Sequence, residues 1–131
     1  MTTATLAAGK THKVAIHVNQ NDPKVMNLAL NNVENVFAYY KQKGQKVTVE
    51  VVTYGPGLNM FVAGESPVAD RLSAMSLEIE DLTLAACGNT LKGMEKKAGK
   101  AVPLISEATV VPSGVVRLIE LQEQGYAYVR P

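Results

Sequence analysis

The ten residues from Asp81 to Thr90, DLTLAACGNT, contain the end of a strand and the start of a helix. Asp81–Ala86 is a short, mostly apolar run, as expected of a strand buried inside a parallel sheet. Cys87-Gly88-Asn89-Thr90 follows at once, and Asn89 or Thr90 can cap a helix that we expect to continue to Lys97. A strand that leads directly into a helix is typical of an α/β fold.

Strands and helices alternate on both sides of this stretch. The other expected strands are Lys13–Val18, Lys46–Thr53, Glu107–Val111 and Tyr126–Val129. Asp22-Pro23 starts a first long helix that ends at Gly44, because aspartate is a good N-cap and proline fits the first helical position. Ser66-Pro67 repeats this pattern before a second helix. The alternation predicts α/β architecture, with a five-stranded, mainly parallel sheet covered on both faces.

Three segments between these elements need separate interpretation. Gly55-Pro56-Gly57 reads as a tight turn, followed by a short helical turn at Leu58–Val62. Val102–Ile105 is ambiguous, because its proline disfavours a central strand. The last helix follows Pro112-Ser113-Gly114 and ends at Gly125. In that helix we expect Val115, Leu118 and Ile119 to face inward and Arg117, Glu120 and Glu123 to face outward.

The composition narrows the class of protein. The 131 residues, 47% of them hydrophobic, suit one domain over residues 1–131, in which we expect residues 1–12 to be flexible. With a formal net charge of only +1, the chain lacks the excess positive charge that is typical of nucleic-acid-binding proteins. A single cysteine excludes an internal disulfide, and no apolar run resembles a signal sequence or a membrane span. We therefore expect a soluble cytoplasmic protein.

Candidate site residues lie in the turns that follow the strands, since ligands of open parallel sheets bind beyond the carboxyl ends of the strands. These turns are Asn19–Asn21, Tyr54–Gly57, Cys87–Thr90 and Pro112–Gly114. Cys87 has the strongest chemistry, because a helix N-terminus favours the thiolate. The alternative is that Cys87 fills space in the core, as buried cysteines commonly do.

Other residues near this edge have structural interpretations that we favour. Ser113 reads as a helix N-cap without a base that would activate it. His17, inside the first strand, reads as an interior histidine, and the alternative is a general base for Cys87. His12 reads as a surface residue. Met60 and Phe61 belong either to the core or to the lining of a pocket or subunit contact.

Three segments of the sequence resemble one known family. LAACGNTL (Leu84–Leu91), VVPSGVV (Val110–Val116) and ELQEQGYAYVRP (Glu120–Pro131) are together similar to the DsrE/DsrF-like family, in particular to its small stand-alone members. The resemblance implies a three-layer α/β/α sandwich that assembles into homotrimers or homohexamers. In sulfur-relay members a cysteine passes a persulfide between partner proteins, and Cys87 matches that cysteine. Such transfer uses no metal or organic cofactor.

Three functional hypotheses follow. In the first, Cys87 carries a persulfide, which Asn89 and Thr90 stabilise together with the helix N-terminus. Gly88 lets backbone or substrate come close, and Asn19, Tyr54 and Ser113 shape the cleft. In the second, the protein is a non-catalytic oligomeric module that binds a small ligand or partner protein between subunits, against Tyr54, Met60 and Phe61. In the third, Cys87 and His17 form the catalytic pair of a hydrolase or transferase.

Overall fold

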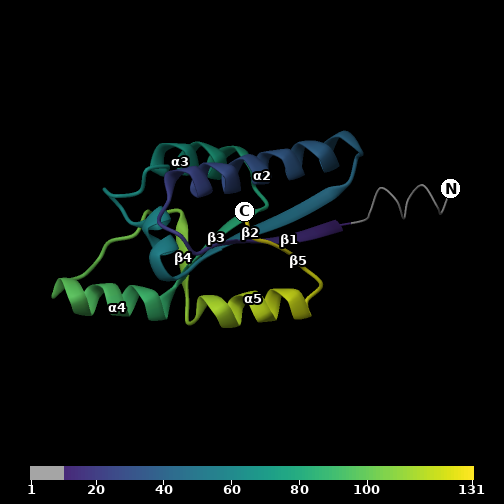
Figure 1. Cartoon of the computed structure of the whole chain (residues 1–131). Coiled ribbons are helices and arrows are strands. Elements are labelled where there is room, and N and C mark those ends of the chain that lie inside the picture. The colour runs from purple at the N-terminus through teal and green to yellow at the C-terminus, as the bar shows by residue number, and fades with distance from the viewer. Residues whose placement is uncertain (1–10) are drawn as a thin grey trace.

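The computed structural model describes residues 11–131 as a parallel sheet between two layers of helices (Figure 1). The sheet has the strand order β4-β3-β2-β1-β5, and every pair of neighbouring strands is parallel. The strands are β1 (Thr11–Val18), β2 (Lys46–Thr53), β3 (Leu82–Cys87), β4 (Ala108–Val111) and β5 (Ala127–Val129). The helices are α2 (Pro23–Gln42), η1 (Gly55–Phe61, a 3₁₀ helix), α3 (Ala69–Glu78), α4 (Gly88–Ala98) and α5 (Gly114–Glu123). The predicted α/β class and five-stranded parallel sheet are confirmed.

The first strand begins earlier than the sequence indicated. Thr11 and His12, which we expected within a flexible segment of residues 1–12, pair with the first two residues of β2. The His12 ring stacks on Tyr40 at 3.8 Å between ring centroids, and its Nε2 lies 2.8 Å from Gln45 Oε1. These contacts explain why a polar residue ahead of the apolar run joins the sheet. The rest of the expected flexible segment lies outside the described residues.

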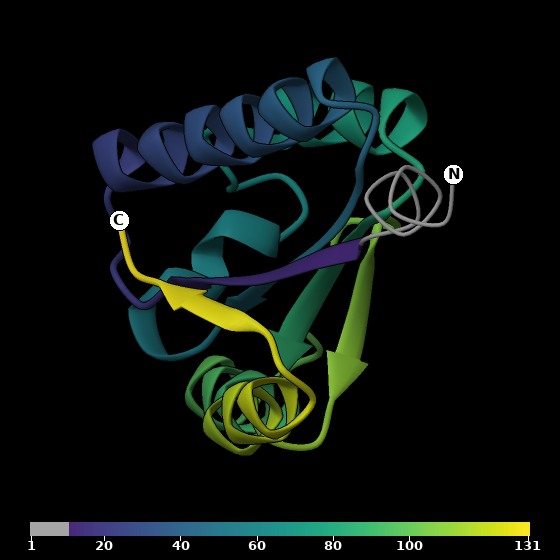
Figure 2. The same ribbon diagram turned by 90° about the vertical axis from the view of Figure 1, so that its right-hand side faces the viewer.

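The larger core lies between the sheet and the layer formed by α2 and α3 (Figures 1 and 2). The cap predicted for the long helix is present, since Asp22 Oδ1 accepts a hydrogen bond from the Lys24 N–H at 2.9 Å. Met60 and Phe61, in η1, are both 0% exposed and belong to this core. They therefore line no accessible pocket, and the alternative that placed them in a binding surface is wrong.

The η1 segment packs tightly against the end of β1. A Cβ atom at Gly57 would lie only 2.2 Å from the Val18 carbonyl oxygen, so this position requires glycine. The ambiguous segment Val102–Ile105 contributes a single antiparallel bridge, between Leu104 and Val62. It is therefore not a sixth strand of the described sheet.

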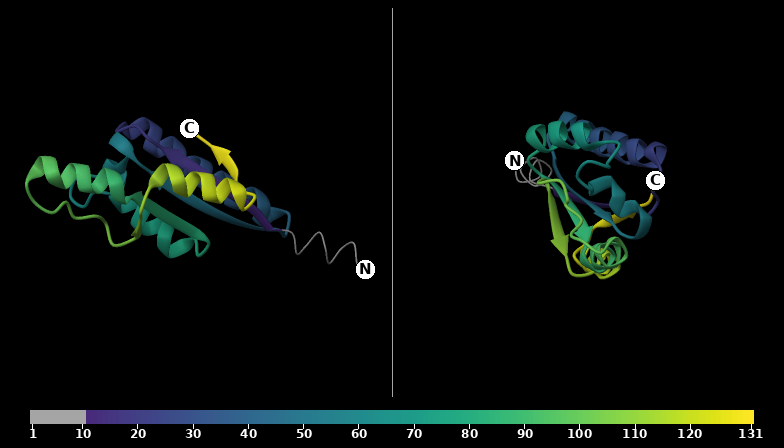
Figure 3. Two further views of the ribbon diagram at one scale, coloured as in Figure 1. Left: turned by 90° about the horizontal axis from the view of Figure 1, so that it is seen from below. Right: turned by 90° about the vertical axis from the view of Figure 1, so that its left-hand side faces the viewer.

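The second layer, α4 and α5, covers the opposite face less completely. Seen from below, α5 crosses the sheet while α4 extends past it (Figure 3). In α5 the buried side chains are Leu118 and Leu121, whereas Val115 and Ile119 are each 51% exposed. Our assignment of Val115 and Ile119 to the inner face is wrong. Arg117, expected to face outward, instead binds the buried Glu50 of β2, so its side of α5 faces the sheet.

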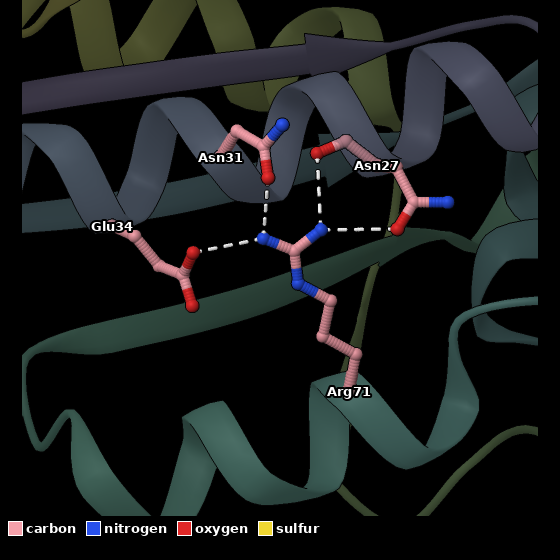
Figure 4. Close-up of polar contacts among 4 residues, drawn as sticks. All are labelled: Asn27, Asn31, Glu34 and Arg71. Atoms are coloured by element: carbon pink, nitrogen blue, oxygen red, sulfur yellow. Dashed lines mark hydrogen bonds and ion pairs between the residues drawn. The ribbon is translucent and has the colours of Figure 1, made fainter.

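Arg71 joins the two helices of the first layer (Figure 4). From α3 its guanidinium donates to the carbonyl and side-chain oxygens of Asn27, to Asn31 Oδ1 and to Glu34 Oε1, all in α2. The Arg71–Glu34 distance is 2.8 Å. Four acceptors at one planar donor group hold α3 in register with α2.

Candidate functional site

A pocket of about 450 Å³ opens at the carboxyl edge of the sheet, around the end of β3. Tyr54, Gly55, Cys87, Asn89, Thr90, Ser113 and Val115 line it. They come from the turns after β2, β3 and β4 and from the first turns of α4 and α5. Parallel strands end at one edge of the sheet, so these turns meet although they are far apart in the sequence. The lining contains no acidic or basic side chain.

Cys87 is both the last residue of β3 and the N-cap of α4. Its Sγ accepts a hydrogen bond from the Thr90 backbone N–H at 3.5 Å. The residue is 5% exposed, so the sulfur lies at the floor of the pocket rather than on the open surface. The thiol thus takes the place that a serine or aspartate side chain usually occupies at a helix start.

A second helix N-terminus reaches the same sulfur. α5 begins at Gly114, where a Cβ atom would lie 3.1 Å from Cys87 Cβ and 2.9 Å from Tyr54 Cδ2. Ser113 caps this helix, its Oγ accepting from the Val116 N–H at 3.4 Å, as predicted. N–H groups that have no partner within their own helix, and the positive ends of two helix dipoles, therefore converge on Cys87.

The Thr90 hydroxyl connects the thiol to the turn after β2. Its Oγ1 accepts a hydrogen bond from the Gly55 N–H at 2.9 Å, and Gly55 has the positive φ of 58° that favours glycine. Because a hydroxyl carries one proton to donate, Thr90 can accept from Gly55 and donate to Cys87 at the same time.

These contacts lower the pKa of the Cys87 thiol. Burial by itself raises this pKa, because it disfavours the charged thiolate. The opposing hydrogen bonds come from the side chain and backbone of Thr90 and from the backbone N–H groups of Gly114 and Asn89, and together they outweigh burial. The hydrogen bonds therefore favour the thiolate form of Cys87 more than burial disfavours it.

Not every predicted site residue joins this pocket. Tyr54, Cys87, Asn89, Thr90 and Ser113 line it, as the sequence suggested. Two others do not, namely Asn19, which follows β1 and lies beside Gly57, and Gly88, which is buried against the Val111 carbonyl oxygen. Sequence reasoning missed Val115, which lines the pocket because it faces outward from α5. Because Ser113 is the N-cap, Val115 lies in the first turn of α5, beside the pocket. The cap position in the sequence could therefore have predicted Val115 as a lining residue.

His17 is 3% exposed and belongs to an aromatic cluster that shares Tyr54 with the pocket. Its Nδ1 lies 2.6 Å from the hydroxyl of Tyr128 in β5, and its ring centroid lies 4.4 Å from that of Tyr54. Burial, with a smaller contribution from the positive charge of Arg130, lowers the pKa of His17. Among the described residues no hydrogen bond joins His17 to Cys87, so the structure does not form the catalytic pair of the third hypothesis.

Two further searches bear on the class of site. Within residues 11–131, no three His, Cys, Asp or Glu side chains gather closely enough to hold a metal ion. No helix of the described chain is long and apolar enough to span a membrane.

The fold and pocket define an α/β protein with a free cysteine at the carboxyl edge of a parallel sheet. The chain belongs to the DsrE/DsrF-like family, whose model matches residues 3–131, and that family is associated with sulfur relay. It is similar in structure to MTH1491, a protein of unknown function from Methanobacterium thermoautotrophicum. The two share 29% sequence identity and a TM-score of 0.78 over 92% of this chain and 99% of that chain. No curated protein sequence matches it.

Proposed function

We propose that this protein carries sulfur as a persulfide on Cys87. The observation that carries the proposal is the convergence of two helix N-termini, α4 and α5, on one sheltered sulfur. The same N–H groups that favour a thiolate would stabilise a terminal persulfide anion. The pocket of about 450 Å³ leaves room beside Cys87 for one additional sulfur atom.

The chemistry needs two exchange steps and no cofactor. The Cys87 thiolate attacks the outer sulfur of a donor persulfide, R–S–SH, forming the Cys87 S–S bond and breaking the donor's S–S bond. The donor leaves as RS⁻, which takes up a proton from water. An acceptor thiolate then attacks the outer sulfur on Cys87 and restores the Cys87 thiolate. Because a lone thiol of this kind works in a reducing compartment, the proposal assigns the protein to the cytoplasm.

Mass spectrometry of the intact protein tests the proposal. After incubation with a persulfide donor and removal of the donor, the wild type is expected to gain about 32 Da, the mass of one sulfur atom. Cys87→Ser is the matched control and gains nothing. A wild-type protein that gains no sulfur, under conditions in which a known carrier does, contradicts the proposal.

The proposal includes assembly into a homotrimer or homohexamer, which exposed apolar side chains support. Val115, Val116 and Ile119 of α5 are 47–51% exposed, and Val115 also lines the Cys87 pocket. Such a group of apolar side chains is typical of an interaction surface. Light scattering with size-exclusion chromatography measures the mass of the particle. Ile119→Lys is expected to shift it toward the monomer, and a monomeric wild type contradicts this part of the proposal.

A non-catalytic binding module remains the second candidate, and the same exposed α5 surface favours it. The two candidates differ in their dependence on the thiol, because binding alone does not need Cys87. If Cys87→Ser preserves the protein's effect in cells while Tyr54→Ala abolishes it, the binding module replaces the carrier.

A further inference from the structure

A buried ion pair connects α5 to the middle of the sheet. Glu50, in β2, is 5% exposed, and both of its carboxylate oxygens are paired with Arg117. Arg117 Nε lies 2.6 Å from Oε2 and Nη2 lies 2.8 Å from Oε1. This fork geometry fixes direction as well as distance. The loss of hydration offsets much of the electrostatic attraction in a buried ion pair. Its main contribution here is therefore to specify one position of α5 on the sheet.

Few other contacts determine where α5 lies along the sheet. Of its ten residues, only Gly114, Leu118 and Leu121 are buried, and the two leucines pack on Ala15, Val52 and Ala85. The partly buried Tyr54, Val111 and Tyr126 pack against the same cluster. Apolar contacts of this kind have little directional preference. The bidentate bond to Glu50 has one, because a displaced guanidinium would leave a buried carboxylate unpaired.

The ion pair lies one helical turn from the Cys87 site. The Arg117 N–H donates to the Ser113 carbonyl oxygen at 2.9 Å, within the same first turn that Ser113 caps. Gly114 follows that cap and meets Cys87 and Tyr54. The bond between Arg117 and the sheet therefore also fixes the position of the α5 N-terminus relative to the Cys87 sulfur.

We propose that Glu50 and Arg117 are positioning residues for Cys87, which hold the N-terminus of α5 against the sulfur and so keep the thiol reactive. The inference deepens the proposed carrier function and rests on it for its biological role. Tyr54 is the only other titratable group in the pocket lining. Glu120 and Tyr126 are the charged and titratable neighbours of Arg117 besides Glu50. The pKa of Arg117 is raised by its hydrogen bonds to Glu50, so its guanidinium stays charged.

The pH profile of Cys87 alkylation by iodoacetamide tests this inference. The double variant Glu50→Met with Arg117→Met removes both charges together and keeps similar volume, which preserves folding better than removing one partner. We expect its midpoint to move to higher pH and its rate at acidic pH to fall about two- to fivefold, the effect of one weakened helix N-terminus. Glu120→Gln, on the same helix, is the control and keeps the wild-type profile.

Arg117→Lys provides a second measurement that does not depend on the double variant folding. It keeps the charge but loses the fork, so we expect a smaller shift of the profile in the same direction. A profile that superimposes on the wild type in a folded double variant, or in Arg117→Lys if the double variant does not fold, overturns the inference. Alkylation needs no sulfur donor, so a failure of the persulfide experiment leaves this result interpretable.

Discussion

Gly114 and Cys87 are so close that a Cβ atom added to the glycine would lie 3.1 Å from the Cys87 Cβ. They begin different helices, α5 and α4, and lie on opposite sides of β4 in the sequence. The missing side chain is what allows the N-terminus of α5 to reach the thiol. The arrangement around Cys87 thus depends on close packing between two helix starts as well as on its own cap position.

Gly114→Ala is expected to destabilise the protein by about 1–3 kcal/mol, because the added methyl group overlaps Tyr54 and Cys87. Urea unfolding followed by circular dichroism measures this loss. Gly93→Ala is the matched control, since apart from its own stretch of the α4 backbone no heavy atom lies within 4 Å of its Cβ position. There the substitution should stabilise the helix by about 0.5–1 kcal/mol. Equal effects at the two glycines would show that Gly114 is not constrained.

Thr90→Val is expected to raise the pKa of Cys87, because valine keeps the shape but loses the hydroxyl that hydrogen-bonds the thiol. The alkylation rate at acidic pH should fall about fivefold, the effect of one hydrogen bond. Thr90→Ser retains the hydroxyl and is expected to keep the wild-type profile. If valine and serine at position 90 give the same profile, the hydroxyl has no role.

His17 is expected to make folding stability depend on pH. Its folded-state pKa is below the 6.5 of an exposed histidine, so the unfolded chain binds the proton more tightly. The stability from the neutral buried ring is fully present above pH 6.5 and is lost as pH falls toward the folded-state pKa. Urea unfolding at pH 7 and at pH 5 measures the difference, which His17→Gln should reduce. An unchanged difference in that variant contradicts the assignment to His17.

Arg71→Ala is expected to cost about 1–2 kcal/mol of stability, since one substitution removes four hydrogen bonds between α3 and α2 (Figure 4). The ion pair alone should contribute little, because both side chains are partly exposed. Glu34→Gln therefore should change stability by less than about 0.5 kcal/mol. Thermal unfolding distinguishes the two variants, and a glutamine variant as unstable as Arg71→Ala would assign the effect to charge.

Local signals were sufficient for the secondary structure and for most of the pocket. The caps at Asp22 and Ser113, the glycine stops and the apolar runs are each recognisable within a few residues of sequence. Because parallel strands end at one edge, the turns after β2, β3 and β4 were predictable as neighbours. This reasoning placed Tyr54, Cys87 and Thr90 together correctly. It failed for Asn19, because the turn after β1 packs on η1 rather than on the thiol.

The sequence by itself determined the order of strands and helices and the position of Cys87 between a strand and a helix, because propensities, caps and apolar periodicity act over short distances. Only the tertiary structure decided the strand order, the bond between Glu50 and Arg117, and the arrival of a second helix N-terminus at the sulfur. Glu50 sits in an apolar strand and Arg117 on an amphipathic helix, and each alone reads as solvent-facing. Their pairing depends on how α5 crosses the sheet, which no local pattern specifies.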